Sequence, residues 1–404
     1  MKNFRLIVLF FYIYWYTILS FVLPFLLTKS NKKKKSILYL AAFFPENAGY
    51  HWRVSKWREE LEKKGYKVDV FSALNETEFK TLLAQNHFKF LITFIRRRFW
   101  QIVHSRNYET VIVRREILLF NDYGNLFLEK LLHKYHPKAI LDFDDDIAAA
   151  KEQPKIITNW YGKLMKENGN KFNETLRLYS YFMVASDYLK KKVLSENKNI
   201  ESNNICVIPT CVDYNIYKPK EYPKNQNNIT FGWIGGDHNY HLLEPIWPIL
   251  NKLSKQFTFS FIVIGGSPIT VETKFPLHFI KWSLHTEVEN LKKIDIGIMP
   301  LTDDLESKGK GGFKLLQYMG LGIVSIASPI TINLDIIENE NNALFAQNNQ
   351  EWEEKFKLIL SNQISLDKIS ANARRRIESE FTFQSNHRKY LEFINYVRNS
   401  GNLV

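Results

Sequence analysis

The part of the chain best suited to chemistry is a loop of lysines and glycines before a helix-forming segment. The loop consists of Lys308, Gly309, Lys310, Gly311 and Gly312. Lys314 falls in the first turn of the helix expected from Phe313. A helix start attracts anions through its amide hydrogens and dipole, glycines let the backbone approach, and lysines add charge. The segment lacks the G-x-x-x-x-G-K-[ST] pattern of a P-loop. It predicts a diphosphate site, with a glycine-rich helix start bearing solvated lysines as the alternative.

A run of aspartates is the second candidate. Asp142 and Asp144 form a D-x-D pattern, whose carboxylates can hold Mg²⁺ or Mn²⁺ against a diphosphate. The acids also fit a cap for a helix beginning near Ile147. In a third interpretation, Asp145 or Asp146 orients a substrate. The residues leave all three interpretations open.

The remaining candidates are less specific. His238 and His241 are three residues apart, but no third metal ligand accompanies them, so hydrogen-bonded structural histidines are the simpler interpretation. Arg115 follows a strand-like segment and fits either a substrate cleft or a structural ion pair. Cys206 and Cys211 indicate neither a zinc site nor a disulfide-rich fold, and we expect a reducing compartment.

The elements that must position these residues alternate between strand and helix. A strand at 36–43, a turn with Gly49, a helix at 51–65 and a strand at 66–72 make a βαβ unit. Further strands are expected at 110–116, 138–143, 181–186 and 205–210. A second βαβ start follows, with strands at 229–236, 257–266, 294–301 and 323–328. The pattern predicts two doubly wound α/β domains facing a cleft, where ligands of such sheets bind.

The expected boundaries follow from these elements and from one polar stretch without periodicity. They are a membrane anchor and basic flank at 1–35, an N-terminal Rossmann-like domain at 36–217, a linker at 218–228, a C-terminal Rossmann-like domain at 229–380, and a C-terminal helix at 381–404 that returns to the N-terminal domain.

Five segments, in order, resemble glycosyltransferase family 4, whose members have the GT-B fold. They are AGYHWRV, LDFDDDI, VIPTCVD leading to Tyr217, FGWIGG, and KGGFKLLQYMGLGIVSIASP. The resemblance spans nearly all of residues 36–400. It implies a retaining glycosyltransferase of the hexosyltransferase type, with a nucleotide-diphosphate sugar as donor substrate, no cofactor and no metal.

The resemblance also implies roles for individual residues. Gly49 would let the first loop approach the donor phosphates, and Gln317 would lie beside the ribose. The other implied donor-binding residues are Gly235, Gly236, Gly311, Gly312 and Phe313. Lys310 and Lys314 would stabilise the departing diphosphate. Asp145, taken from the aspartate run and not from the resemblance, is the candidate to orient the acceptor. The family usually has two glutamates eight positions apart where this chain has Gly309 and Gln317.

The amino terminus carries a long apolar segment. Leu6–Leu27 extends about 33 Å as a helix, enough to cross a bilayer. Five lysines follow it, against two basic side chains before it, so we expect a single-pass anchor in the cytoplasmic membrane with the catalytic domains on the cytoplasmic side. A segment packed on the membrane face or against the domain is the alternative.

Charge is concentrated in the same region. The net charge of the chain is +13, but residues 1–36 hold seven basic side chains and no acid, and the remainder has an ordinary balance. We therefore expect no nucleic-acid partner. A second basic segment, residues 88–104, carries Arg96, Arg97 and Arg98 within an apolar helix. It fits either a membrane-surface helix or a core helix with a solvated edge.

The predicted function is transfer of a sugar from a nucleotide-diphosphate donor to a glycan or lipid-linked acceptor, in cell-envelope polysaccharide biosynthesis. One alternative is a catalytically silent sugar-nucleotide-binding or scaffold protein of an envelope complex, motivated by Gly309 and Gln317. The other is a metal-dependent transferase that uses the aspartates.

Overall fold

The structure is a computed structural model that describes residues 2–27, 32–122, 124–152, 170–220 and 228–400. The chain divides into two compact units, Met1–Pro209 with His387–Val404 (unit 1) and Thr210–Asn386 (unit 2). The division falls before the boundary expected at 217. Most of the expected linker (221–227), part of the basic flank (28–31) and the last four residues lie outside the described residues.

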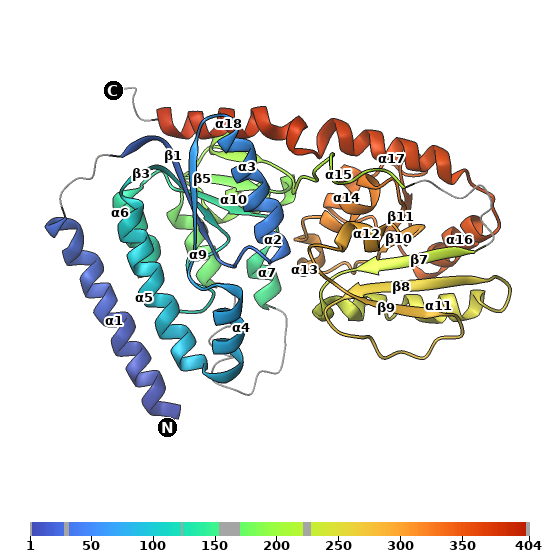
Figure 1. The fold of residues 1–404 in the computed structure, drawn as a ribbon, viewed down its shortest axis with the longest axis horizontal. Coiled ribbons are helices and arrows are strands. Elements are labelled where there is room, and N and C mark those ends of the chain that lie inside the picture. The colour runs from blue at the N-terminus through green and yellow to red at the C-terminus, as the bar shows by residue number, and fades with distance from the viewer. Residues whose placement is uncertain (1, 28–31, 123, 153–169, 221–227, 401–404) are drawn as a thin grey trace. The chain divides into compact units, whose positions relative to one another are not determined.

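Unit 1 is built on a six-stranded parallel sheet with the strand order β2-β1-β3-β4-β5-β6. Figure 1 shows the unit as a ribbon, with β1, β3 and β5 among its labelled strands. Its strands are β1 (Lys33–Ala41), β2 (Lys67–Ser72), β3 (Tyr108–Arg114), β4 (Ile140–Phe143), β5 (Tyr181–Val184) and β6 (Ile205–Val207). The central strands are buried along most of their length, as expected of a parallel sheet covered by helices on both faces.

The helices of unit 1 alternate with these strands, and several begin at a polar cap. They are α1 (Lys2–Leu26), α2 (Ala48–Tyr50), the π-helical η1 (His51–Ser55), α3 (Lys56–Glu62), α4 (Glu76–Gln85), α5 (His87–Ser105), α6 (Phe127–Tyr135), α7 (Ile147–Glu152), α9 (Asn170–Leu178), α10 (Asp187–Glu196), the short η2 (Ser202–Asn204) and, from His387 on, α18 (Phe383–Asn399). Asn75 and Glu78 form a capping box at α4, and Ser186 caps α10.

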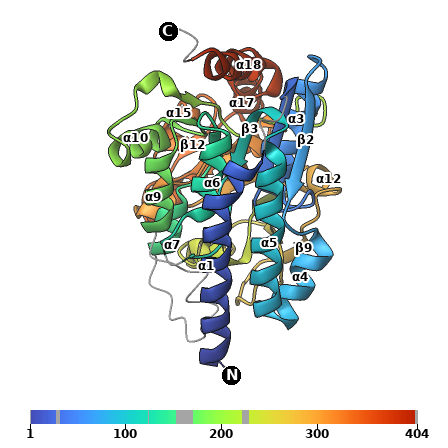
Figure 2. The same cartoon turned by 90° about the vertical axis from the view of Figure 1, so that its left-hand side faces the viewer.

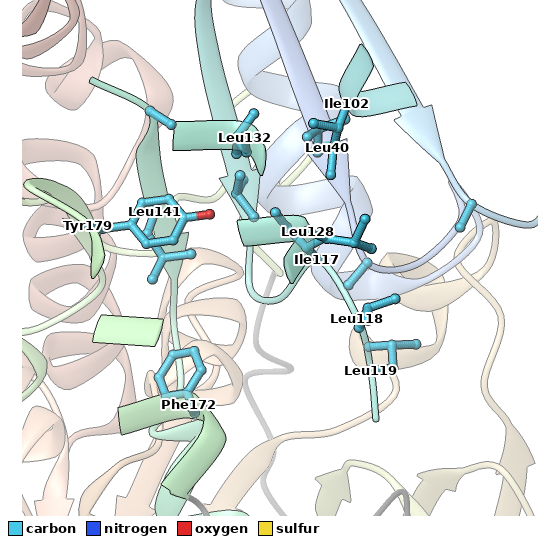
Figure 3. Close-up of a cluster of buried hydrophobic side chains, with 14 of the residues drawn as sticks. Leu40, Ile102, Ile117, Leu118, Leu119, Leu128, Leu132, Leu141, Phe172 and Tyr179 are labelled. Atoms are coloured by element: carbon cyan, nitrogen blue, oxygen red, sulfur yellow. The ribbon is translucent and has the colours of Figure 1, made fainter. Parts of the chain in front are cut away.

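The core of unit 1 lies between the sheet and the helices that cover it. Figure 3 shows part of this core, where Leu40 of β1 and Leu141 of β4 pack with Leu128 of α6 and Phe172 of α9. The carboxyl-terminal helix α18 joins the unit through Tyr390, whose ring stacks on Trp57 at 4.0 Å. Helix α18 is therefore part of the unit 1 fold.

Helix α1 is the one helix among the described residues that is long and apolar enough to cross a membrane, over Phe4–Leu26. It runs beside α5 and α6, against which it packs (Figure 2). The expected apolar helix is present, and it contacts the domain along one face.

Helix α5 is a core helix, as one of the two interpretations of residues 88–104 held. Arg98 is fully buried and donates to the carbonyl oxygens of Ala41 (2.6 Å) and Phe71 (3.1 Å). Burial lowers the pKa of Arg98 to about 9. Arg97 pairs with Glu78 at 2.6 Å. The interpretation that all three arginines face lipid headgroups is wrong, because two of them turn toward the protein.

Unit 2 repeats the architecture with a second parallel sheet in the order β12-β11-β10-β7-β8-β9. Its strands are β7 (Ile229–Ile234), β8 (Phe259–Gly265), β9 (Leu277–Lys281), β10 (Ile296–Met299), β11 (Val324–Ala327) and β12 (Leu344–Phe345). The sequence predicted four of them and missed the edge strands β9 and β12. The predicted fold class, two doubly wound α/β domains, is confirmed.

The helices of unit 2 cover both faces of this sheet. They are the 3-10 helix η3 (Asp237–Leu243), α11 (Ile246–Leu253), α12 (Glu287–Leu291), α13 (Leu305–Lys308), α14 (Phe313–Gly320), α15 (Ile332–Ile336), α16 (Asn349–Leu360) and α17 (Leu366–Glu380). The amide of Ile234, at the end of β7, donates to the hydroxyl of Tyr318 in α14 (3.0 Å). This bond fixes α14 against the central strand.

Candidate functional site

The predicted diphosphate site lies at the point of unit 2 where the strand order reverses. Strand β7 has β8 on one side and β10 on the other, so the connections leave it in opposite directions. Gly235 and Gly236 follow β7, and the loop that leads to α13 and α14 follows β10. In doubly wound sheets, the carboxyl ends of the strands at such a point form the ligand crevice.

Helix α14 begins at this edge, and Gly312 allows it to do so. Gly312 has φ of +70°, a conformation that side chains other than glycine rarely adopt. A Cβ atom there would also lie 3.0 Å from Ile332. Phe313 and Lys314 make the first turn, so the positive end of the helix dipole lies directly after the glycines.

Lys314 extends from α14 to the end of β7. Its Nζ lies 4.1 Å from the centroid of the Trp233 ring, a cation–π contact. A Cβ atom on Gly235 would lie 2.6 Å from the same nitrogen. Glycine at position 235 therefore leaves the space that the ammonium group occupies.

Lys310 reaches the same segment from the loop before α14. Its Nζ donates to Oδ1 of Asn239 (3.1 Å) and pairs with Glu306 (3.3 Å). Asn239 lies in η3, three residues after Gly236. The two lysines therefore contact the chain on either side of Gly235 and Gly236, and together with these glycines we call them the lysine–glycine site.

Asp237 fixes the position of this glycine turn. Its Oδ1 accepts hydrogen bonds from the amides of Gly266 (2.8 Å) and Ser267 (3.1 Å), directly after β8. Although desolvation acts to raise the pKa of Asp237, these hydrogen bonds lower it. The carboxylate therefore stays ionised and ties two loops at the same edge of the sheet. The sequence interpretation assigned no role to Asp237.

Gln317 belongs to a buried polar group that sequence reasoning missed. Its Nε2 donates to the hydroxyl of Tyr217 (2.9 Å) and to Oε1 of Glu287 (2.7 Å). The Tyr217 hydroxyl also donates to Oε1 of Glu287 (3.0 Å), and Nε1 of Trp282 donates to Oε2 (2.7 Å). Burial and the Glu287 carboxylate raise the pKa of Tyr217 well above its usual range. We call these four residues the Glu287 cluster.

The Glu287 cluster bears on the role predicted for Gln317. A primary amide has two hydrogens, and those of Gln317 are directed to Tyr217 and Glu287. Its side chain is 3% exposed. Contact between Gln317 and a ribose stays a prediction, and its amide oxygen is the atom that would make this contact. The other motif position, Gly309, caps the short helix α13.

A pocket of about 500 Å³ adjoins the loop that carries these residues. It lies at the carboxyl ends of β10 and β11, and its lining includes Lys308, Ser328, Thr331 and Trp352. The hydroxyl of Thr331 donates to the carbonyl oxygen of Lys308 (2.9 Å), which joins the two sides of the pocket. Unit 2 thus has a hollow next to its predicted anion site.

The reversal point of unit 1 holds a group of buried charges. Asp142, at the end of β4, pairs with Arg53 from η1 and with Arg114 from β3 (3.4 Å to the latter). Asp144 pairs with Arg114 at 2.6 Å. Although burial acts to raise the pKa of Asp144, the charges of Arg114, Arg115 and Arg53 lower it to about 2. Both acids of the D-x-D pattern are therefore paired with arginine.

The neighbouring candidates surround this charge group. Gly49 lies in α2, where a Cβ atom would be 3.5 Å from Nη2 of Arg114. Arg115 has φ of +69°, a strained conformation for arginine, and its amide donates to the carbonyl oxygen of Asp142 (2.8 Å). Asp145 is half-buried beside the paired acids. Unit 1 thus brings Gly49, Arg115 and Asp145 to one edge of its sheet.

Two structural interpretations of candidate residues are confirmed. Oδ1 of Asp146 accepts from the amide of Ala149 (3.1 Å), so this acid caps α7. His238 and His241 make local hydrogen bonds, to the side chain of Asn239 and to a backbone carbonyl. Within the described residues, no group of three or more histidine, cysteine or acidic side chains is arranged to hold a metal ion. Both cysteines are buried, and burial raises the pKa of Cys206 to about 11.

The two sheets with their alternating helices define the class of the fold. It is the GT-B fold, in which two Rossmann-like domains make up a glycosyltransferase. No family model matches the sequence, and no curated protein matches it. The assignment to family 4 therefore stays a prediction.

Solved structures share this fold at low sequence identity. A glycosyltransferase from Rickettsia africae is 15% identical with a TM-score of 0.61, over 92% of this chain and 100% of that protein. Anabaena HepE in complex with UDP-glucose is 13% identical with a TM-score of 0.61, over 89% and 99%. The lipopolysaccharide outer core galactosyltransferase WaaB is 13% identical with a TM-score of 0.56, over 89% and 99%. The chain has the fold of these glycosyltransferases over 89–92% of its length.

Proposed function

We propose that this chain is a glycosyltransferase that moves a sugar from a nucleotide-diphosphate donor to a glycan or lipid-linked acceptor. The observation that carries the proposal is the lysine–glycine site, where Lys310 and Lys314 flank Gly235 and Gly236 at the reversal point of unit 2. The GT-B fold supports the reaction class, and the UDP-glucose complex of HepE supports the type of donor.

The proposed chemistry follows from the charge that develops as the donor breaks. Cleavage of the bond between sugar and diphosphate places negative charge on the departing phosphate oxygen. The ammonium groups of Lys310 and Lys314 and the amide end of α14 stabilise that charge without reorganising. Asn239 and Glu306 hold the Lys310 ammonium in place. We propose transfer without a metal ion, because the lysines supply the positive charge, and with retention of configuration, as the resemblance to family 4 implies.

The residues of unit 1 are proposed to serve the acceptor. Asp145 would orient the attacking hydroxyl, and Gly49 and Arg115 lie at the same edge of that sheet. Asp142 and Asp144 are engaged by Arg53 and Arg114, which favours a structural role for them over the alternative of a metal-dependent transferase.

An envelope role is proposed from the apolar helix and from one structural neighbour. Helix α1 offers membrane contact next to the domain proposed to bind the acceptor. WaaB acts in the lipopolysaccharide outer core by its name, which supports a comparable acceptor class. We place the catalytic units on the cytoplasmic side, because the anionic cytoplasmic leaflet attracts the seven basic side chains of residues 1–36.

The second candidate function is binding of a sugar nucleotide without turnover, in a scaffold role. The Glu287 cluster favours it, because both amide hydrogens of Gln317 are directed to Tyr217 and Glu287 and Gly309 offers no side chain.

The two functions are separated by donor turnover. Purified full-length chain in detergent is screened by thermal shift against UDP-, GDP- and ADP-sugars, and each stabilising donor is then assayed for hydrolysis and transfer. We expect turnover that is unchanged by excess EDTA. Stabilisation without turnover of any donor would favour the scaffold, and activity lost in EDTA and restored by Mn²⁺ would favour the metal-dependent mechanism.

A further inference from the structure

Helix α1 carries a packing seam along its full length. Its inward positions alternate in steps of three and four residues, the spacing with which one helix packs along another. They are Leu6, Leu9, Ile13, Tyr16, Ser20 and Leu23, and Leu27 directly after the helix continues the spacing. Leu9, Ile13, Tyr16 and Ser20, in the middle of the helix, are buried. The seam therefore contacts unit 1 where a spanning helix would cross the centre of the bilayer.

Polar contacts along this seam tie α1 to the domain. Nδ2 of Asn125 donates to Oγ1 of Thr17 (2.8 Å). Nζ of Lys134, in α6, donates to the carbonyl oxygen of Ser20 (3.0 Å) and lies 4.3 Å from the centroid of the Phe21 ring. If α1 crossed a bilayer in this arrangement, Lys134 would enter the hydrocarbon, which costs several kcal/mol. The contacts therefore disfavour a transmembrane orientation for the docked helix.

The opposite face of α1 is apolar and aromatic. Sixteen large hydrophobic side chains are exposed in the described residues, and eleven of them lie on α1. The eleven are Phe4, Ile7, Phe10, Phe11, Tyr14, Trp15, Ile18, Phe21, Val22, Phe25 and Leu26. An apolar patch of this size marks an interaction surface, and tryptophan and tyrosine favour the interface between lipid and water.

Positive charges border this face along the helix. Arg5 is exposed near its start, Arg96 of α5 interacts electrostatically with Tyr12 near its middle, and Lys134 lies over Phe21 near its end. The described residues of α1 include no acid. Trp100, one turn after Arg96 on α5, is exposed as well. Cations beside an aromatic face match an anionic lipid surface.

We propose that α1, docked on α5 and α6, lies in the plane of an anionic membrane leaflet and inserts its outer face without crossing the bilayer. The inference concerns attachment and does not rest on the transfer activity. In this arrangement the contact between α1 and the helices α5 and α6 holds unit 1 in one orientation to the lipid surface. The single-pass anchor expected from the length of the segment is the competing arrangement.

The first experiment measures lipid binding of the full-length chain by flotation with vesicles of phosphatidylcholine, with and without 30% phosphatidylglycerol. Ile18 on α1 and Ile216 in unit 2 are each 41% exposed and provide a matched pair. We expect Ile18→Ser to lower partitioning, and Phe11→Ser together with Ile18→Ser to lower it by about tenfold or more. Ile216→Ser should leave it unchanged, and removal of the anionic lipid should weaken it. Equal binding by all variants would overturn the proposal, as would dimerisation without lipid binding.

The second experiment separates in-plane from transmembrane attachment. The variant Asn3→Cys is reconstituted with unit 1 and unit 2 outside sealed vesicles and is treated with a membrane-impermeant maleimide. Cys206 and Cys211 are buried and provide a low background of labelling. An in-plane helix keeps Asn3→Cys on the outer side, so we expect labelling before detergent is added and release of the chain by alkaline carbonate. Labelling only after detergent, with the chain resistant to carbonate, would establish a transmembrane helix and refute the proposal.

Discussion

Substitution of Gln317 by glutamate tests the Glu287 cluster and the departure from the usual family motif together. Nε2 of Gln317 lies 2.7 Å from Oε1 of Glu287, and both side chains are buried. Gln317→Glu replaces a donating amide by a second carboxyl group at hydrogen-bond distance from the first. The structure therefore predicts that glutamate is tolerated at this position only if one carboxyl keeps its proton.

The size of the stability loss in Gln317→Glu follows from the less costly of two states, one with both carboxyls ionised and one with a single carboxyl protonated. Two charges about 3 Å apart repel by roughly 5–6 kcal/mol at an effective dielectric constant of about 20. Keeping one carboxyl protonated costs about 1.4 kcal/mol for each pH unit above its ordinary pKa of about 4.3. We therefore expect unit 2 to lose about 5 kcal/mol of unfolding free energy at pH 8 and about 1 kcal/mol at pH 5. Because folding raises the carboxyl pKa, the variant regains stability as the pH falls.

The assay is urea unfolding of wild type and variant at both pH values, followed by tryptophan fluorescence. The control is the double exchange Gln317→Glu with Glu287→Gln, which restores one amide and one carboxylate and should recover most of the loss. An equal loss at pH 5 and pH 8, or no recovery in the double exchange, would refute the reasoning.

Three further predictions concern other contacts. Lys310→Ala should weaken binding of UDP or GDP by about tenfold, as measured by calorimetry, whereas Lys310→Arg should keep most of the affinity. Equal affinities would contradict the role of Lys310 in binding the diphosphate. Asp144→Asn should lower the free energy of unfolding by about 2 kcal/mol at pH 7 and by less at pH 3. The reason is that a carboxyl whose folded pKa is about 2 stabilises the fold above its unfolded pKa and loses that contribution as the pH falls. A loss independent of pH would argue against the ion pairs. Deletion of residues 1–31 should expose the surface of α5 and α6 that the seam of α1 covers, and so lower the melting temperature. Each fully buried side chain contributes about 1.5–3 kcal/mol to the free energy of unfolding. An unchanged melting temperature would contradict the docked arrangement of α1.

Local patterns in the sequence predicted most of the fold. Apolar runs next to glycine turns marked the strands from β1 to β8 and the strands β10 and β11, since buried parallel strands are almost continuously apolar. Strand β9 is half-exposed at a sheet edge, and β12 has two residues, so neither carries such a signal. A signal was present for the seam of α1, where Thr17 and Ser20 interrupt the apolar run on the side that faces the domain.

The candidate site was predictable only where its residues are close in sequence. The helix start at Gly312 and the position of Lys314 follow from local spacing. The partners of these groups do not, because Trp233 is far from Lys314 in the chain and the Glu287 cluster joins residues from 217 to 317. The arginine partners of Asp142 and Asp144 are likewise distant in sequence, so a D-x-D pattern could not be recognised as a structural ion-pair group.

The most direct test of the lysine–glycine site is nucleotide binding by Lys314→Ala in the full-length chain. Isothermal titration with UDP, GDP and ADP is compared for wild type, Lys314→Ala and the control Lys255→Ala, whose side chain is exposed elsewhere in unit 2. We predict that wild type and control bind one of the three alike, and that Lys314→Ala binds it at least about tenfold more weakly with an unchanged melting temperature. Equal affinity in all three proteins would contradict the assignment of the diphosphate to this site.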